Sequence, residues 1–145
     1  MTTTAAKPLG MFGLLKAANA VADFVETRLA TVGLSIPKLA ALQRLVDAGD
    51  TLPLGQLAGR LACVKSNVTQ LVDRLEADGL VERILDPADK RSRLAVITEA
   101  GRSACAEGAR IQREAEETLF ASLSPDEASL LADIVRKLSP GCHHP

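Results

Sequence analysis

The sequence predicts a mainly α-helical fold with one small antiparallel sheet, in the order helix, helix, strand, helix, helix, strand, strand, helix, helix. Apolar residues recur every three or four positions along most of the chain, as they do on the buried face of a helix. Two apolar runs, residues 80–85 and 93–98, flank a turn that contains Pro and Asp, a pattern typical of a β-hairpin. With 145 residues, 47% of them hydrophobic, the chain can bury one core, so we expect a single domain.

The first two helices are predicted from periodicity and from capping signals. Residues 9–32 place apolar side chains at three-and-four spacing on one face. Gly33 is expected to end this helix as its C-terminal cap. Ser35 can cap a second helix, and Pro37 suits the first turn of that helix. The second helix should end near Ala48.

Residues 54–61 and 65–77 predict two short helices with only three residues between them. So short a connection makes the helices cross at a steep angle, as in a helix-turn-helix. The acidic residues of the second helix lie in its C-terminal half, so the end expected to meet DNA is cationic. An alternative is that its polar face is only the solvated surface of a helix. The candidates for contact with base edges or phosphates are Lys65, Ser66, Asn67, Thr69, Gln70 and Arg74.

A hairpin directly after a helix-turn-helix is typical of a winged helix, a structure that binds duplex DNA. The tip of this hairpin presents Lys90, Arg91 and Arg93, and cations suit the negative potential of a narrow minor groove. Asp89 is expected to support the wing by holding Arg91 in a charge-assisted pair. Alternatively, the charged tip only keeps a sheet edge soluble.

After Thr98 a long helical pattern runs to about Leu119. A final helix is signalled by the sequence Ser124-Pro125-Asp126-Glu127, in which Ser and Glu have the spacing of a capping box.

The segment LACVKSNVTQLVDRLEADGLVERILDPADKRSRLAVITEAG, residues 61–101, resembles the central part of the MarR family of bacterial transcriptional regulators. The resemblance lies in the helix-turn-helix, the LVDRLEADGLV junction, and the D-x-R wing followed by T-E-A-G. In detail it covers about residues 52–101. It implies a homodimeric repressor that binds a pseudo-palindromic operator in double-stranded DNA and releases it when a small-molecule effector binds.

The resemblance also implies how the chain is divided. We expect a disordered N-terminus (1–8), dimerisation helices (9–34 and 99–138), a winged helix-turn-helix lobe (35–98) and a frayed tail (139–145). The dimerisation helices carry more apolar positions than one lobe can cover, and a symmetric partner would bury them. An effector cleft would lie between the lobe and these helices. Its candidate residues, each equally suited to the core, are Phe12, Leu15, Leu42 and Ile111.

Three positions depart from the pattern of the family. Val64 stands where a Ser usually caps the recognition helix, so a cap contributing about 1 kcal/mol is expected to be missing. Ala62 replaces a common Gly at the turn. Gln70 replaces a common Arg, which lowers electrostatic affinity and weakens the case for a guanine contact at that position.

The three cysteines are widely spaced and odd in number, which favours a reducing compartment over a disulfide framework. Cys63 lies in the turn of the helix-turn-helix, either as a small buried apolar residue or as a redox-sensitive thiol that controls DNA binding. Cys105 should pack in the core or in the dimer interface. We expect no metal and no other cofactor, although a weak metal-binding alternative exists in the tail at Cys142, His143 and His144.

Composition and motifs argue against other classes of function. No apolar run reaches the roughly 18 residues that cross a bilayer, and the N-terminus lacks a signal-peptide pattern, so we expect a cytoplasmic protein with no membrane partner. Histidine occurs only at positions 143 and 144, and no Gly-rich phosphate loop, HExxH or GxSxG motif is present, so an enzyme is not expected. The net charge of -1 gives no overall attraction to DNA, and local basic clusters must supply it. The remaining rival is a winged helix that binds protein.

Overall fold

A computed structural model of the protein describes residues 10–61 and 67–139. Within these ranges the predicted order of elements is confirmed, and the sheet contains the three expected strands. The elements are α1 (Met11–Ala30), α2 (Ile36–Asp47), β1 (Thr51–Pro53), α3 (Leu54–Arg60), α4 (Val68–Ala77), β2 (Val81–Leu85), β3 (Arg93–Ile97), α5 (Glu99–Phe120) and α6 (Pro125–Leu138).

Local signals set the helix boundaries where the sequence predicts them. Gly33 follows α1 with φ +73°, a conformation that favours glycine, and the next N–H donates to the Leu29 carbonyl at 3.0 Å. The Ser35 side chain caps α2 by accepting from the backbone N–H of Lys38. At the start of α6, Ser124 and Glu127 form the expected capping box.

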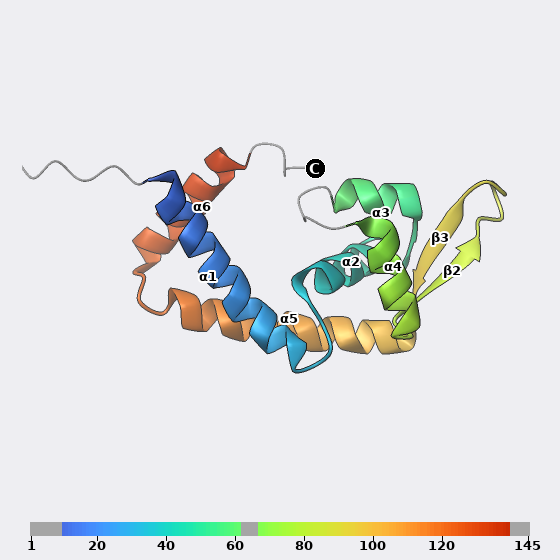
Figure 1. Cartoon of the computed structure of the whole chain (residues 1–145), viewed down its shortest axis with the longest axis horizontal. Coiled ribbons are helices and arrows are strands. Elements are labelled where there is room, and N and C mark those ends of the chain that lie inside the picture. The colour runs from blue at the N-terminus through green and yellow to red at the C-terminus, as the bar shows by residue number, and fades with distance from the viewer. Residues whose placement is uncertain (1–9, 62–66, 140–145) are drawn as a thin grey trace, which may run out of the picture.

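The lobe and the outer helices occupy opposite ends of the molecule (Figure 1). At one end α2, α3 and α4 pack together, and the β2–β3 hairpin projects from them as the wing. At the other end lie the first turns of α1 and the whole of α6. The long α5 runs from the base of the lobe towards that outer end, so it connects the two regions.

The sheet is antiparallel, with β3 in the middle in the order β1-β3-β2. Ala95 at the centre of β3 is opposite Leu52 on one side and Arg83 on the other. The end of the sheet next to α5 is anchored, because Val81 and Ile97 are buried there. Ile84 and Leu85 at the far end are exposed, so the wing extends into solvent.

The core is built almost entirely from branched aliphatic side chains. No polar or charged side chain is buried in the described part of the chain. The core joins all the elements of the lobe to α5, which contributes Cys105, Ile111 and Ala115. The largest fully buried side chains are Leu29, Leu42, Leu45, Leu57, Leu61, Leu75, Val72 and Val81.

Two glycines allow α5 to lie directly against the lobe. A Cβ at Gly101 would stand 2.1 Å from the carbonyl oxygen of Leu80 and 2.7 Å from Ile97, distances at which the backbone must move. A Cβ at Gly108 would meet the ends of the Leu39 and Leu34 side chains at 2.7 and 2.8 Å. The glycine of the T-E-A-G sequence therefore has a packing role that the motif alone did not reveal.

Outside the lobe, large apolar side chains remain exposed. Residues 10–21 of the chain are all exposed, and α6 has no buried residue. Within residues 10–61 and 67–139, no helix is long and apolar enough to span a membrane. The exposed apolar residues of α1 and α6 include Met11, Phe12, Leu14, Leu15, Leu130, Ile134, Val135 and Leu138.

The packing at Gly101 leads to a stability prediction. Gly101→Ala should lower the free energy of unfolding by about 2 kcal/mol or more, because the new methyl group meets a backbone carbonyl that cannot rotate away. Gly108→Ala should cost less, since the ends of leucine side chains can shift. Urea unfolding at fixed protein concentration measures both changes.

Gly55→Ala is the matched control, because a Cβ there has no neighbour within 4 Å. This variant should be at least as stable as the parent. Equal stabilities for Gly101→Ala and Gly55→Ala would contradict the prediction.

Candidate functional site

Helix α4 has a buried face and a polar face, as predicted. Leu71, Val72 and Leu75 are buried in the core. Thr69, Gln70 and Arg74 are exposed on the other face. The strip of exposed polar side chains is therefore present on α4, and contacts of these residues with DNA stay a prediction.

The start of α4 differs from the sequence prediction. The helix begins at Val68 instead of Lys65, and Asn67 is its N-cap. The Oδ1 atom of Asn67 accepts from the backbone N–H of Gln70 at 3.3 Å. A cap is therefore present at this later position, because an Asn side chain can reach the free amides of the first turn. Lys65 and Ser66 lie outside the described residues, as do Ala62, Cys63 and Val64.

Capping also changes what Asn67 can offer to a partner. Its carbonyl oxygen is engaged, so the side-chain NH₂ group remains as the donor. The surface beside it extends beyond α4 to the start of α2, where Ser35 and Lys38 line a shared hollow with Asn67 and Arg74. This contribution of α2 cannot be predicted from the sequence, because nothing in the local pattern shows which helix end lies next to α4.

The acidic half of α4 is fastened to the wing by Arg83 of β2. The guanidinium of Arg83 donates to Asp73 at 2.5 Å and to Glu76 at 3.1 Å, and the backbone N–H of Arg83 donates to Glu76 at 3.1 Å. These hydrogen bonds hold the pKa of Glu76 below its ordinary value, chiefly through the Arg83 side chain. The same contacts, with Glu76 first and Asp73 second, raise the pKa of Arg83.

This Arg83 clamp accounts for the charge pattern seen in the sequence. Through this clamp Asp73 anchors α4 to its own scaffold. Arg74 is exposed and forms no ion pair within the described ranges. The clamp leaves Arg74 facing outward and ties the recognition helix and the wing together at one residue.

The tip of the wing is braced by aspartates. Asp86 accepts from the backbone N–H of Ala88 at 2.9 Å, and Asp89 accepts from the backbone N–H of Arg91 at 3.0 Å. Asp89 therefore supports Arg91, but not through the expected pair with its guanidinium, which is not formed among the described residues. The side chains of Lys90, Arg91 and Arg93 are exposed.

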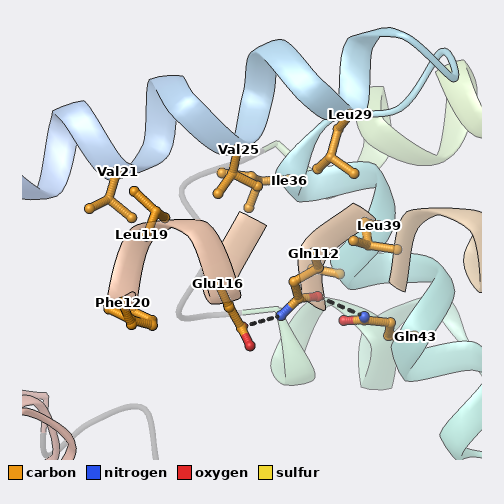
Figure 2. Close-up of a pocket in the computed structure, with 11 residues that line it drawn as sticks. Val21, Val25, Leu29, Ile36, Leu39, Gln43, Gln112, Glu116, Leu119 and Phe120 are labelled. Carbon is orange, nitrogen blue, oxygen red and sulfur yellow. Dashed lines mark hydrogen bonds between the residues drawn. The ribbon is translucent and has the colours of Figure 1, made fainter. Parts of the chain in front are cut away.

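A cavity of about 280 Å³ lies between α1, α2 and α5 (Figure 2). On its polar side, Gln43 donates to Gln112 at 3.1 Å, and Gln112 donates to Glu116 at 3.1 Å. The first of these hydrogen bonds connects α2 of the lobe to the long α5, and the second lies within α5. The rest of the wall is apolar and includes Val21, Val25, Ile36, Leu39, Leu119 and Phe120.

The four residues proposed from the sequence for an effector cleft do not line this cavity. Leu42 and Ile111 are buried in the core, and Phe12 and Leu15 are exposed on the first turns of α1. Other faces of α1, α2 and α5 line the space, and its use as an effector cleft stays a prediction. Helical periodicity identifies the apolar face of a helix, but it does not indicate whether another helix packs against that face or leaves a space beside it.

The remaining candidate residues are cysteines and histidines. One of them lies in the core, and the others lie in the C-terminal tail outside the described residues. Cys105 is buried, as expected, and burial, with a smaller effect of Asp47, raises the pKa of its thiol. Among the described residues, no three side chains of the metal-binding types form a cluster. Cys142, His143 and His144 lie outside the described residues.

Known proteins resemble this chain in both sequence and fold. The family model of MarR matches residues 34–92. The uncharacterised HTH-type transcriptional regulator YkoM of Bacillus subtilis is 33% identical over 112 residues, which cover 77% of this chain and 72% of YkoM. A probable transcriptional regulator from Pseudomonas aeruginosa is 30% identical, with a TM-score of 0.78 over 88% of this chain and 94% of that chain.

Another solved structure concerns regulation of DNA binding. BpsR of Bordetella bronchiseptica, whose DNA binding is regulated by 6-hydroxynicotinic acid, is 25% identical to this chain. Its TM-score is 0.75, and the match covers 87% of this chain and 95% of that chain. These alignments extend well beyond the winged lobe into the outer helices.

The Arg83 clamp leads to a prediction about pH. Arg83→Gln should raise the pKa of Glu76 towards its ordinary value, because the guanidinium that favours the carboxylate is removed. Since the folded-state pKa of Glu76 is lowered, the clamp stabilises the fold above about pH 4.3, the ordinary value for Glu, and this contribution is lost as pH falls through the lowered pKa. Carbon-13 NMR titration of the Glu76 carboxyl group measures the shift.

Arg102→Gln serves as the control, because it breaks a different ion pair, with Asp50. It should leave the titration of Glu76 unchanged. An ordinary pKa for Glu76 in the parent protein would show that the clamp does not form in solution.

Proposed function

The chain belongs to the MarR family of transcriptional regulators, and on this premise we propose that its homodimer binds a pseudo-palindromic operator with α4 in the major groove and the wing in a minor groove. The observation that carries this proposal is the exposed polar face of α4 together with the Arg83 clamp, which engages the nearby acidic groups. Negative charge that would repel phosphate is thereby partly neutralised beside the surface that meets DNA.

The side chains divide by the contacts that they can make. Gln70 and the NH₂ group of Asn67 are suited to base edges, and Thr69 to bases or phosphates. Arg74 is suited to phosphates, and Lys65 and Ser66, like Thr69, to phosphates or bases. At the wing, Arg91 is the residue proposed for the minor groove, with Lys90 and Arg93 beside it.

We further propose that the exposed apolar faces of α1 and α6 form the dimer interface. Both helices present large aliphatic side chains to solvent in the single chain, and a symmetric partner would remove them from water. Two recognition helices would then meet half-sites about one turn of DNA apart. Because the target is chromosomal DNA, we propose a cytoplasmic location.

Control by a small molecule is the last part of the proposal. The DNA binding of BpsR, a relative of similar fold, is regulated by a small molecule. In this chain the cavity between α1, α2 and α5 lies where a ligand would touch both the lobe and the long helix. We propose that a ligand there changes the angle between them and releases the operator, so that the protein acts as a repressor.

The DNA contacts can be tested with Arg91→Ala. This variant should bind operator and unrelated duplexes more weakly by a similar factor. The slope of log K against the logarithm of the salt concentration should become less steep by about one. Gln70→Ala should instead reduce the preference for the operator. Fluorescence anisotropy of labelled duplexes from the upstream region of the gene, over a range of salt, measures both effects.

Arg113→Ala, which removes the same charge from an exposed position on α5, is the control and should bind like the parent. If the parent binds no duplex at low salt, the proposed function is wrong and a protein-binding role is favoured. If Arg91→Ala binds as well as Arg113→Ala, the wing does not contact DNA.

The dimer interface can be tested with Leu130→Glu on α6. Leu130 is 59% exposed in the single chain, and a charge there should be costly only if a partner covers it. The variant should therefore shift from dimer to monomer in sedimentation velocity. Ser129→Glu, at the neighbouring position, introduces the same charge at a polar residue and should remain dimeric. A monomeric parent would contradict the proposal.

A further inference from the structure

We propose that the cavity between α1, α2 and α5 binds neutral or cationic aromatic molecules that carry N–H donors, and that it rejects carboxylates of the same shape. The inference rests on the proposed function in one respect, because such a molecule would be the effector. Binding to the free protein, measured without DNA, tests it separately from operator binding.

The size and apolar walls of the cavity define the body of the ligand. About 280 Å³ is lined mainly by aliphatic side chains, with Phe120 at one end, and one side is open to solvent (Figure 2). This volume is at the lower limit of small-molecule sites, so a single planar ring is the natural occupant. Burial of such a ring against aliphatic walls supplies the main favourable contribution to binding.

The polar wall defines the functional group of the ligand. Its hydrogen bonds all run in one direction, from Gln43 to Gln112 and from Gln112 to Glu116. The chain therefore ends at both sides in acceptors, the amide oxygen of Gln43 and the carboxylate of Glu116. A ligand with N–H groups can donate to these acceptors without breaking the chain.

The charges around the cavity favour the same class of ligand. Glu116 is the one charged side chain among the described residues that line it, and none of them is Lys or Arg. Glu26, beside the cavity, adds a second carboxylate, which accepts from the backbone N–H of the lining residue Ile36 at 2.8 Å. Neither Arg110, which is paired with Glu107 and Glu114, nor Arg113 of α5 lines the cavity.

A carboxylate ligand would thus lose its water without meeting a cation. Burial of an unpaired charge is unfavourable, and repulsion from Glu116 adds to that cost. An amide avoids the charge, and an amidinium gains an opposite charge as well as a matching pair of donors.

The test compares three probes of nearly identical shape: benzoate, benzamide and benzamidine, whose charges are -1, 0 and +1. The chain contains no Trp or Tyr, so its own fluorescence cannot report binding, and isothermal titration calorimetry of the full chain at neutral pH is used instead. We expect benzamidine and benzamide to bind with a Kd at least about tenfold lower than that of benzoate.

Two variants on the same helix locate the origin of this preference. Glu116→Gln keeps the size of the side chain and removes its charge, so the three probes should bind within about threefold of one another. Glu117→Gln makes the same change at an exposed neighbour that does not line the cavity, and it should keep the order of the parent.

A third variant confirms the place of binding. Ala40→Leu fills the cavity from α2 and should weaken all the probes that bind the parent, with its helix content checked by circular dichroism.

Several results would overturn the inference. Benzoate binding as tightly as benzamide would show that charge is not selected as proposed. Failure of both benzamide and benzamidine to bind up to their solubility limits would show that the cavity does not take this class. Equal effects of Glu116→Gln and Glu117→Gln would place the selectivity elsewhere. If the parent still binds its operator in these cases, only this inference fails, whereas loss of operator binding alone would concern the proposed function.

Discussion

The fold depends on how closely α5 lies against the winged lobe. This approach is possible because Gly101 has no side chain where the Leu80 carbonyl oxygen stands and Gly108 has none where Leu34 and Leu39 pack. Once α5 is held there, its first half completes the core of the lobe, and its second half forms one wall of the cavity. One contact between a helix and a lobe therefore sets the position of the cavity relative to the lobe.

A second constraint acts within the lobe. Asp73 and Glu76 would be unfavourable beside phosphate, but both are bound to Arg83 of the wing. Their charges are used to orient α4 relative to β2, and the polar residues at the start of the helix are left outside this clamp. One half of this short helix is anchored to the wing, and the other half is exposed. A protein with a net charge of -1 can therefore present a local surface suited to DNA.

The cavity depends on the first of these constraints, because α5 forms one of its walls. Its walls come from α1, α2 and α5, and its polar side joins the lobe to the long helix through Gln43 and Gln112. The core contains no buried charged or polar side chain among the described residues, whereas this chain consists of two half-buried amides and the exposed carboxylate of Glu116. It is well placed to select a ligand by charge and to transmit its presence between the two regions.

Much of the fold and of the polar surface of α4 was already determined by the order of the residues. The elements, the caps at Ser35 and Ser124, the wing and the outward polar face of α4 follow from periodicity and short-range hydrogen bonding, which act over a few neighbouring residues. The cap of α4 by Asn67 is also a short-range hydrogen bond, although the sequence pattern placed the start of the helix earlier. Only tertiary structure decided that Asp73 and Glu76 meet Arg83, and which faces of three helices leave a cavity. Phe12 and Leu42 have equally good apolar patterns, yet one is exposed and the other lies in the core, because burial depends on which distant segment packs opposite.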